Sequence, residues 1–155
     1  MYVQDLMTKS VVFCRPEDTL ALAAARMWEN DCGIVPVLRH DNVLIGMLTD
    51  RDICMATLFR GRPLDAIAVG EAMVKHVAFV HPGQNVDVAA RLMADLKVRR
   101  IPVVDPKEQL LGIISISDIA RESVRQGSKL DRGNVRPIDT LAAICQPRGA
   151  APRRA

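Results

Sequence analysis

The sequence repeats itself at an offset of 66 residues. Residues 3–56 align with residues 69–122 without a gap, and fifteen of these fifty-four pairs are identical. Most of the other pairs keep their apolar or polar character. Two copies of one small unit predict a pseudo-two-fold arrangement in which each half completes the core of the other. They also predict two related clefts, and those clefts are where function is to be sought.

Length and composition limit the class of protein. A chain of 155 residues suits one compact domain or two half-sized lobes that share an interface. No apolar run approaches the roughly 18 to 20 residues that span a bilayer. The N-terminus has no basic region followed by an apolar stretch, as a secretory signal would. We therefore expect a cytoplasmic protein with no membrane segment.

Basic charge is concentrated near the C-terminus. Residues 126–155 hold six basic and two acidic side chains, a net charge of +4, so the remainder carries −1 of the total of +3. This stretch has little periodicity, and we expect a basic, partly disordered tail. Such a tail can contact nucleic acid or an acidic partner, or act only as a solvated extension. Low aromatic content and the lack of a basic recognition helix disfavour nucleic acid as the partner.

The sequence contains no motif for metal binding or catalysis. The four cysteines form no C-x-x-C pair and have no closely spaced histidine, so we predict no metal site. A G-x-S-x-G sequence and a P-loop lysine are also absent. We therefore predict that the protein is not an enzyme.

Each copy is predicted to fold as β-α-β-β-α, which is an α/β (α+β) unit. Thr19 and Asn85 are equivalent and are good helix N-caps. Apolar residues follow both of them at helical spacing. Pro36 and Pro102 interrupt the next strand, so we expect them at a sheet edge or at a strand start. The predicted elements of the first copy are, in order, a short amphipathic segment at 3–7, a β run at 11–13, a helix from 20, strands at 34–38 and 43–48, and a final helix.

The sharpest local motif lies where the last strand of each copy enters its last helix. Thr49 precedes Asp52 by three residues, and Ser115 precedes Asp118 by three. One interpretation is a helix capping box, with aspartate in the acidic position. The other is a ligand site, because a helix N-terminus attracts phosphate and a carboxylate can accept hydrogen bonds from ribose hydroxyls. The motif alone leaves both interpretations open.

Together these residues resemble a known family. The repeat, the Ile/Val-Pro-Val strand and the Gly-x-x-Thr/Ser-x-x-Asp ending are similar to tandem CBS domains, named for cystathionine β-synthase. The resemblance covers residues 1–125. It implies two repeats related by a pseudo-two-fold axis that form one CBS pair (a Bateman module) with two clefts. It further implies an adenosine-containing ligand such as AMP, ADP, ATP or S-adenosylmethionine, and a homodimer of two modules.

The resemblance also implies roles for individual residues. Thr49 and Ser115 would contact phosphate, and Asp52 and Asp118 would hold the ribose. Two basic residues before the second Ile-Pro-Val strand would bind phosphates. The remaining residues would enclose the base or line the cleft. The predicted binding residues, besides those four, are Arg99, Arg100, Ile101, Pro102, Ile34, Val35, Pro36, Ser10, Val11, His76 and Val77.

The two copies differ where the basic pair lies. Gly33 and Ile34 stand opposite Arg99 and Arg100. We therefore expect the cleft with the two arginines to prefer more highly phosphorylated ligands. Trp28, which stands opposite an alanine, is interpreted as a packing residue.

These observations lead to a regulatory protein with no catalytic domain. We predict CBS repeats at 1–60 and 61–125 and a tail at 126–155. An adenosine-containing ligand would shift the relative orientation of the halves, and an unidentified regulated protein would receive the signal. Two alternatives stay open: a ligand-independent protein–protein interaction module, and a nucleic-acid-associated regulator that uses the basic tail.

Overall fold

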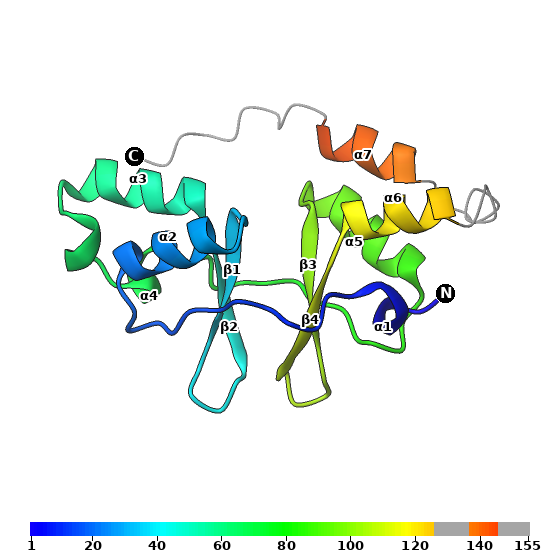
Figure 1. Ribbon diagram of the computed structural model, residues 1–155, viewed down its shortest axis with the longest axis horizontal. Helices are drawn as coiled ribbons and strands as arrows, with labels where there is room; N and C mark the ends of the chain where they lie inside the picture. The colour runs from blue at the N-terminus through cyan, green and yellow to red at the C-terminus, as the bar shows by residue number, and fades with distance from the viewer. Residues whose placement is uncertain (126–136, 146–155) are drawn as a thin grey trace.

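The computed structural model describes residues 1–125 and 137–145. It consists of two similar halves that lie side by side, each a β-hairpin flanked by helices (Figure 1). The mixed helix-and-strand fold expected from the sequence is confirmed. None of the helices in the described ranges is long and apolar enough to cross a membrane. The elements are α1 (Val3–Leu6), α2 (Leu20–Glu29), β1 (Ile34–Leu38), β2 (Leu44–Thr49), α3 (Asp50–Arg60), the 3-10 turn η1 (Leu64–Ala66), α4 (Val69–Ala72), α5 (Val86–Leu96), β3 (Arg100–Val104), β4 (Leu110–Ser115), α6 (Ile116–Arg125) and α7 (Pro137–Cys145).

Local sequence signals explain the start of the long helices. The Thr19 side chain accepts a hydrogen bond from the Leu22 amide at 3.2 Å, and so caps α2. The Asn85 side chain accepts from the Asp87 amide at 2.9 Å and caps α5. Each cap satisfies one of the free amides of the first turn. The two caps predicted from the sequence are confirmed.

The sheet of each half is smaller than predicted. β1 pairs with β2, and β3 with β4, as two antiparallel two-stranded sheets. The β run at 11–13 forms no strand, and its end makes only one parallel bridge, from Cys14 to Val37. Its counterpart makes one such bridge, from Val80 to Val103. The cause is the path of the chain, because each of these segments crosses from one hairpin to the other (Figure 1).

The crossing segments pair with the hairpin of the opposite half. Thr8 bridges Ile113 in β4 before its segment reaches the first half. Val74 bridges Met47 in β2 before its segment reaches the second half. In each half, the hairpin therefore forms backbone hydrogen bonds with the crossing segment that leads into the other half.

Pro36 lies in the middle of β1 rather than at its start. Its partner in register is Met47, whose amide and carbonyl both bond to Val74 instead of to β1. The lack of an N–H on Pro36 therefore removes no hydrogen bond from the β1–β2 ladder. The Pro36 carbonyl faces the other way and accepts from the Cys14 amide at 3.0 Å.

The core is shared between the halves, as the repeat predicted. Val3 of α1 is fully buried in the apolar cluster of the second half. Ile67 and Val69, which follow the first repeat, are fully buried in the cluster of the first half. A third cluster joins the two hairpins through Leu38 and Val104. The core of each half is thus completed by residues from the segment that leads into the other half.

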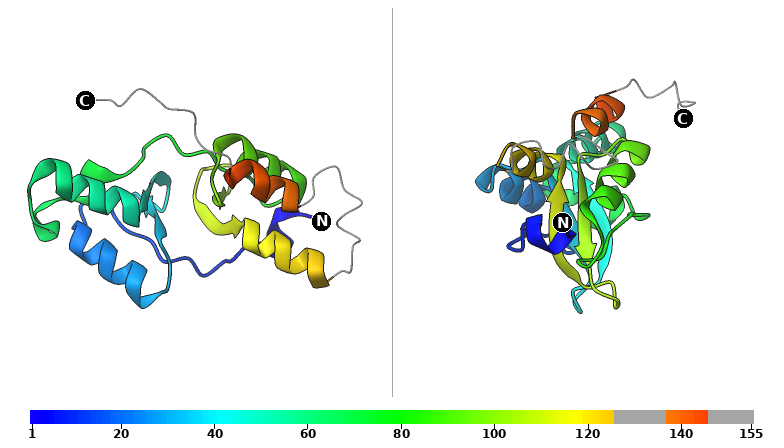
Figure 2. Two further views of the ribbon diagram at one scale, coloured as in Figure 1. Left: turned by 90° about the horizontal axis from the view of Figure 1, so that it is seen from above. Right: turned by 90° about the vertical axis from the view of Figure 1, so that its right-hand side faces the viewer.

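α7 is an element that the sequence analysis did not predict. It packs against α5 and α6 (Figure 2), and its Ile144 joins the apolar cluster of the second half. The remainder of the predicted tail, residues 126–136 and 146–155, lies outside the described residues. The boundaries at 1–60, 61–125 and 126–155 stay a prediction.

Candidate functional site

The candidate site is built around the two helix N-termini that follow β2 and β4. Thr49 ends β2 directly before α3, and Ser115 ends β4 directly before α6. Both helices therefore begin at the same end of their hairpins (Figure 1). Each presents the partial positive charge that suits an anion. Most of the first-turn amides already donate within the protein, those of Asp50, Arg51 and Asp52 in α3 and those of Ile116 and Asp118 in α6.

Thr49 and Asp52 bond to one another. The Thr49 amide and hydroxyl both donate to Asp52 Oδ2, at 2.9 and 2.7 Å, and the Asp52 amide donates back to Thr49 Oγ1 at 3.1 Å. This is a full capping box. The capping interpretation of the motif is therefore satisfied in this structure, with no ligand needed to explain it.

The second half repeats this arrangement and differs in one respect. The Ser115 amide and hydroxyl donate to Asp118 Oδ2 at 2.8 and 2.6 Å. The other oxygen of Asp118 accepts from Arg121, which also forms an ion pair with it. Asp52 Oδ1 accepts no hydrogen bond from any residue within 1–125 or 137–145. Among the described residues, one carboxylate oxygen is therefore open on Asp52, while its counterpart on Asp118 is occupied by Arg121.

The predicted strand residues lie beside these N-termini. Ile34 is the register partner of Thr49, and Arg100 is the register partner of Ser115. The Ile116 amide donates to the Arg99 carbonyl at 2.9 Å, which holds the start of α6 against the start of β3. The structure thus brings the predicted basic pair close to the Ser115–Asp118 motif.

Arg99 and Arg100 carry charge that no residue in 1–125 or 137–145 neutralises. Both side chains are exposed. Neither guanidinium forms a hydrogen bond or an ion pair with any residue that the structure describes. Next to a helix N-terminus, two such cations favour a highly charged anion.

The strand residues behind the basic pair do not reach the surface. Ile101 and Pro102 are buried, and so are Val35 and Pro36 in the first half. Any contact that these residues make with a ligand would therefore run through backbone atoms or require the halves to move. Ile34 is half-buried and offers more of its side chain.

The remaining predicted residues lie on the crossing segments. Ser10 and His76 are exposed, and Val11 and Val77 are half-buried. His76 and Val77 line a surface hollow of about 390 Å³ together with Leu44 and Glu108 of the two hairpins. This hollow lies between the halves, and its lining does not include the Thr49–Asp52 or Ser115–Asp118 motif. The predicted residues therefore fall into two groups, at the helix N-termini and at the crossing segments.

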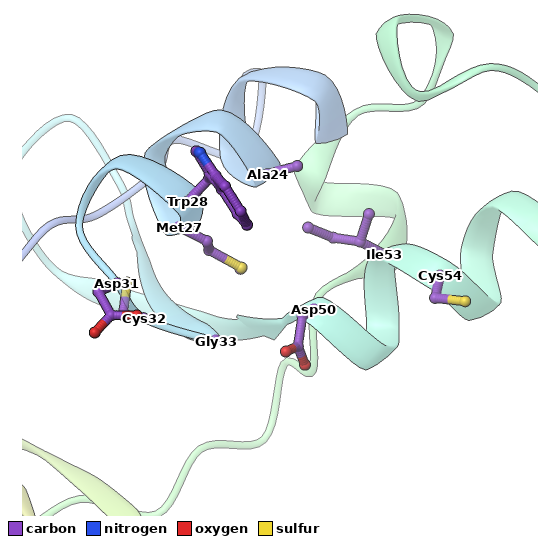
Figure 3. A pocket seen from close by; sticks show the side chains of 9 residues that line it. All are labelled: Ala24, Met27, Trp28, Asp31, Cys32, Gly33, Asp50, Ile53 and Cys54. Carbon is purple, nitrogen blue, oxygen red and sulfur yellow. The ribbon is translucent and has the colours of Figure 1, made fainter.

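A second hollow, of about 490 Å³, lies between α2 and α3 of the first half (Figure 3), and its lining includes Gly33 and Asp50, the neighbours of Ile34 and Thr49 in the sequence. It is lined by residues of α2 and α3, among them Trp28. The interpretation of Trp28 as a packing residue is wrong, because its side chain is 89% exposed. Helical periodicity places Trp28 beside the buried residues of α2, but nothing in the first half covers that side of the helix within the described residues.

Metal ligands do not gather in the described residues. No group of three or more His, Cys, Asp or Glu side chains in 1–125 and 137–145 could hold a metal ion. Burial raises the pKa of the Cys14 thiol, with Arg26 opposing the shift, so this cysteine is a poor thiolate ligand at neutral pH.

Comparison with known proteins agrees with this geometry. The CBS domain family model matches residues 3–58 and 69–125. The chain is 37% identical over 118 residues to CBS domain-containing protein YhcV of Bacillus subtilis, covering 76% of this chain and 82% of that protein. It is 30% identical over 148 residues to hypoxic response protein 1 of Mycobacterium tuberculosis, covering 96% of each.

Solved structures also match the fold. The structure of CBSX2 in complex with AMP superposes with a TM-score of 0.71 at 26% identity, covering 81% of this chain and 97% of that one. A crystal structure of hypoxic response protein I with two coordinated zinc ions gives a TM-score of 0.72 at 33% identity, covering 78% and 98%.

Proposed function

This chain belongs to the CBS domain family, and we propose that it is a regulatory module that binds an adenosine-containing ligand between its two repeats. The observation that carries the proposal is the pair of helix N-termini with an aspartate one turn inside. One of these lies beside Arg99 and Arg100, which pair with no side chain in the part of the chain that the structure describes. Phosphate is favoured at such N-termini, and a carboxylate suits ribose hydroxyls. The AMP complex of CBSX2, which shares the fold, supports the same ligand class.

In this proposal Thr49 and Ser115 contact phosphate, and Asp52 and Asp118 hold the ribose. The first-turn amides of α3 already donate to Gly33, Asp50 and Thr49, so a phosphate at this N-terminus would displace one of these bonds. Asp52 Oδ1 accepts no hydrogen bond from the described residues and is open to a ribose hydroxyl. Arg121 must release Asp118 before a ribose can bind there. Ser10, Val11, His76 and Val77 on the crossing segments would contact the base, with backbone groups of 34–36 and 101–102.

The basic pair makes the two clefts unequal. Arg99 and Arg100 would add charge-assisted hydrogen bonds to a β- or γ-phosphate, while Gly33 and Ile34 offer none. We therefore propose that the cleft near Ser115 prefers ADP or ATP over AMP. S-adenosylmethionine, which lacks phosphates, would gain nothing from the two arginines.

Ligand binding would act by shifting the relative orientation of the repeats. The halves share their core, so a ligand that bridges them favours one orientation in proportion to its differential affinity for the two states. The regulated partner, cytoplasmic location, homodimer and absence of catalysis belong to the same proposal.

One alternative has a specific observation in its favour. The two Thr/Ser–Asp pairs satisfy one another without a ligand, as a protein–protein interaction module would require. Such a module predicts no response to any adenosine compound. A nucleic-acid role through the basic tail would instead give salt-dependent binding that disappears when residues 126–155 are removed.

A thermal-shift panel tests the proposal. It would use AMP, ADP, ATP, S-adenosylmethionine, NAD and GTP, with zinc chloride alone to test for a metal. A ligand present at one hundred times its dissociation constant adds about 2.7 kcal/mol to the free energy of unfolding, a shift of roughly 5 to 10 °C in a chain of this size. We expect a shift with at least one adenosine compound.

Matched variants assign the response to a cleft. Asp52→Asn and Asp118→Asn keep the side-chain shape and remove the charge, and the one in the occupied cleft should weaken binding at least about tenfold. Arg99→Gln with Arg100→Gln should weaken ATP binding more than AMP binding, while Arg91→Gln, an exposed arginine on α5, should leave both unchanged. Thr19→Ala removes the cap of α2 and controls for lost stability. No shift with any adenosine compound, in proteins that are all folded, would support the interaction module instead.

A further inference from the structure

The helix α7 covers one of two equivalent surfaces of the molecule. It packs against α5 and α6 in the second half, and its Ile144 is only 9% exposed. Four residues of that half share an apolar cluster with Ile144: Ala90, Met93, Ile116 and Ile119. Their counterparts, 66 positions earlier, all line the hollow between α2 and α3: Ala24, Met27, Asp50 and Ile53. The hollow is therefore the counterpart, in the first half, of the surface under α7.

The two surfaces differ in charge and in aromatic content. Three pairs of equivalent residues account for the difference: Trp28 and Ala94, Asp31 and Lys97, and Asp50 and Ile116. The first member of each pair lines the hollow and is exposed, and Trp28 is 89% exposed. The surface that accepts an apolar helix in the second half is thus acidic and aromatic in the first.

The carboxylates of the hollow have no basic partner in 1–125 or 137–145. Asp31 and Asp50 form no ion pair there, not even with Arg51, which follows Asp50 in the sequence. Trp28 comes from α2 and Asp50 from the start of α3, on two sides of the hollow (Figure 3). A guanidinium group can stack on an indole and pair with a carboxylate beside it. The hollow therefore favours a segment that carries arginine.

The chain contains such a segment directly after α7. Residues 146–155 include no acidic residue and three basic ones: Arg148, Arg153 and Arg154. α6 runs away from the first half and α7 runs back, so the C-terminal end of α7 is the end nearer the first half (Figures 1 and 2). An extended stretch of residues 146–155 spans up to about 33 Å, roughly the diameter of a small domain. The segment is therefore long enough to reach the hollow.

We propose that residues 146–155 cover the hollow between α2 and α3, with an arginine stacked on Trp28 and paired with Asp31 or Asp50. The C-terminal part of the chain then covers the two equivalent surfaces in turn. The apolar α7 lies on the apolar surface, and the basic segment after it lies on the acidic one. The proposal goes beyond nucleotide binding and does not depend on it. Because the segment belongs to the same molecule, its effective concentration at the hollow is on the order of 1 mM, and contacts of modest affinity suffice.

The test uses the full chain without nucleotide. Trp28 is the only tryptophan in the chain, so its emission wavelength and its quenching by acrylamide report on this one side chain. In the wild-type protein we expect an indole that is protected from acrylamide at every protein concentration of a dilution series. The protection should shrink at about 1 M salt, where charges are screened beyond about 3 Å.

Variants on both sides of the contact identify the segment. Replacing its three arginines together, as Arg148→Gln, Arg153→Gln and Arg154→Gln, should shift the emission to the red. The same change should at least about double the quenching constant, because more than half of the wild-type segments are bound at an effective concentration above their dissociation constant. Asp31→Asn with Asp50→Asn should have the same effect, and asparagine tolerates the φ of 47° at Asp31.

The matched control removes the same charge from the stretch that precedes α7. It combines Lys129→Gln, Arg132→Gln and Arg136→Gln, and it should leave the indole protected. A synthetic peptide of residues 146–155, added to the variant without the three C-terminal arginines at concentrations on the order of 1 mM, should restore the protection. The same peptide with glutamine in place of its arginines should not. Far-UV circular dichroism would verify that every variant is folded.

Four results would overturn the proposal. A wild-type indole that acrylamide quenches freely would leave the hollow uncovered by this chain. Protection that grows with protein concentration would mean that a second copy covers the hollow. Protection that withstands the loss of Arg148, Arg153 and Arg154 at every concentration would indicate another part of the chain. Equal loss of protection in the matched control would mean that net charge, and not this segment, determines the environment of Trp28.

Discussion

Cys14 stands where the second repeat has Val80, and the two residues behave alike. Their side chains are 0% and 1% exposed, and each makes the single parallel bridge that joins its crossing segment to a hairpin. Burial raises the pKa of the Cys14 thiol above its ordinary value of 9.0, and the hydrogen bond to Arg26 only partly opposes this. Cys14 therefore acts as a small apolar residue rather than as a reactive thiol.

We expect Cys14 to resist alkylation near neutral pH while Cys54, which is exposed, reacts readily. Brief N-ethylmaleimide labelling followed by peptide mass spectrometry would measure both. Because the folded-state pKa is raised, this thiol leaves stability unchanged below pH 9.0 and lowers it as the pH rises further, where the unfolded chain releases the proton. Labelling of the two cysteines at similar rates in folded protein would contradict the assignment.

Equivalent positions can also hold different residues with one shared role. An Arg15 nitrogen donates to the Leu38 carbonyl at 3.3 Å, and His81 Nδ1 lies 2.9 Å from the Val104 carbonyl, the counterpart of Leu38. Each side chain also contacts the ring of the phenylalanine two residues earlier. His81 is therefore a structural residue that ties its loop to the end of a strand, which agrees with the lack of a catalytic motif around it.

At the scale of elements, the glycines of the Gly-x-x-Thr/Ser-x-x-Asp motif exist because two segments approach closely. A Cβ on Gly112 would lie 2.7 Å from the Thr8 carbonyl oxygen, and one on Gly46 would lie 3.0 Å from that of Val74. These are the crossing segments that pair with β4 and β2. The glycines therefore allow the crossing segments to lie close against β4 and β2.

Gly112→Ala should therefore lower the free energy of unfolding by about 1 to 3 kcal/mol, because a backbone atom must move to make room. Gly83→Ala is the matched control, since its Cβ would meet nothing within 4 Å, and it should change the free energy by less than about 0.5 kcal/mol. Urea denaturation followed by circular dichroism measures both. Equal effects of the two substitutions would show that the close approach is absent in solution.

At the scale of the whole molecule, the core of each half includes residues from the segment that leads into the other half, so the stability of each half depends on the other. The cluster of the first half contains Ile67 and Val69, from the segment that leads into the second repeat, and the cluster of the second half contains Val3, from the start of the first repeat. A third cluster holds the hairpins together. Neither half can bury its core alone, so we expect the two repeats to unfold as one unit.

Cys14 offers a probe for this cooperativity, because it is buried in the cluster of the first half. Pulsed thiol labelling of Cys14 in increasing urea reports on that half, and far-UV circular dichroism reports on both. The two transitions should share one midpoint. An earlier midpoint for Cys14 would mean that the first repeat opens by itself.

Much of the local structure could be predicted from the sequence because its causes are local. Thr19 and Asn85 cap helices through atoms two or three residues away. Thr49 and Asp52 meet because both lie in the first turn of one helix. The repeat itself predicts two equivalent halves with a shared core, and the CBS family resemblance that it carries is confirmed.

Other features depend on contacts between residues far apart in the chain, which no local pattern records. The crossing segments form bridges instead of strands because each serves two hairpins. Arg121 occupies Asp118 while nothing described occupies the free oxygen of Asp52. α7 packs on the second half and leaves Trp28 of the first in contact with water. Periodicity reveals which side of a helix is apolar, but only the tertiary structure decides whether another element covers it.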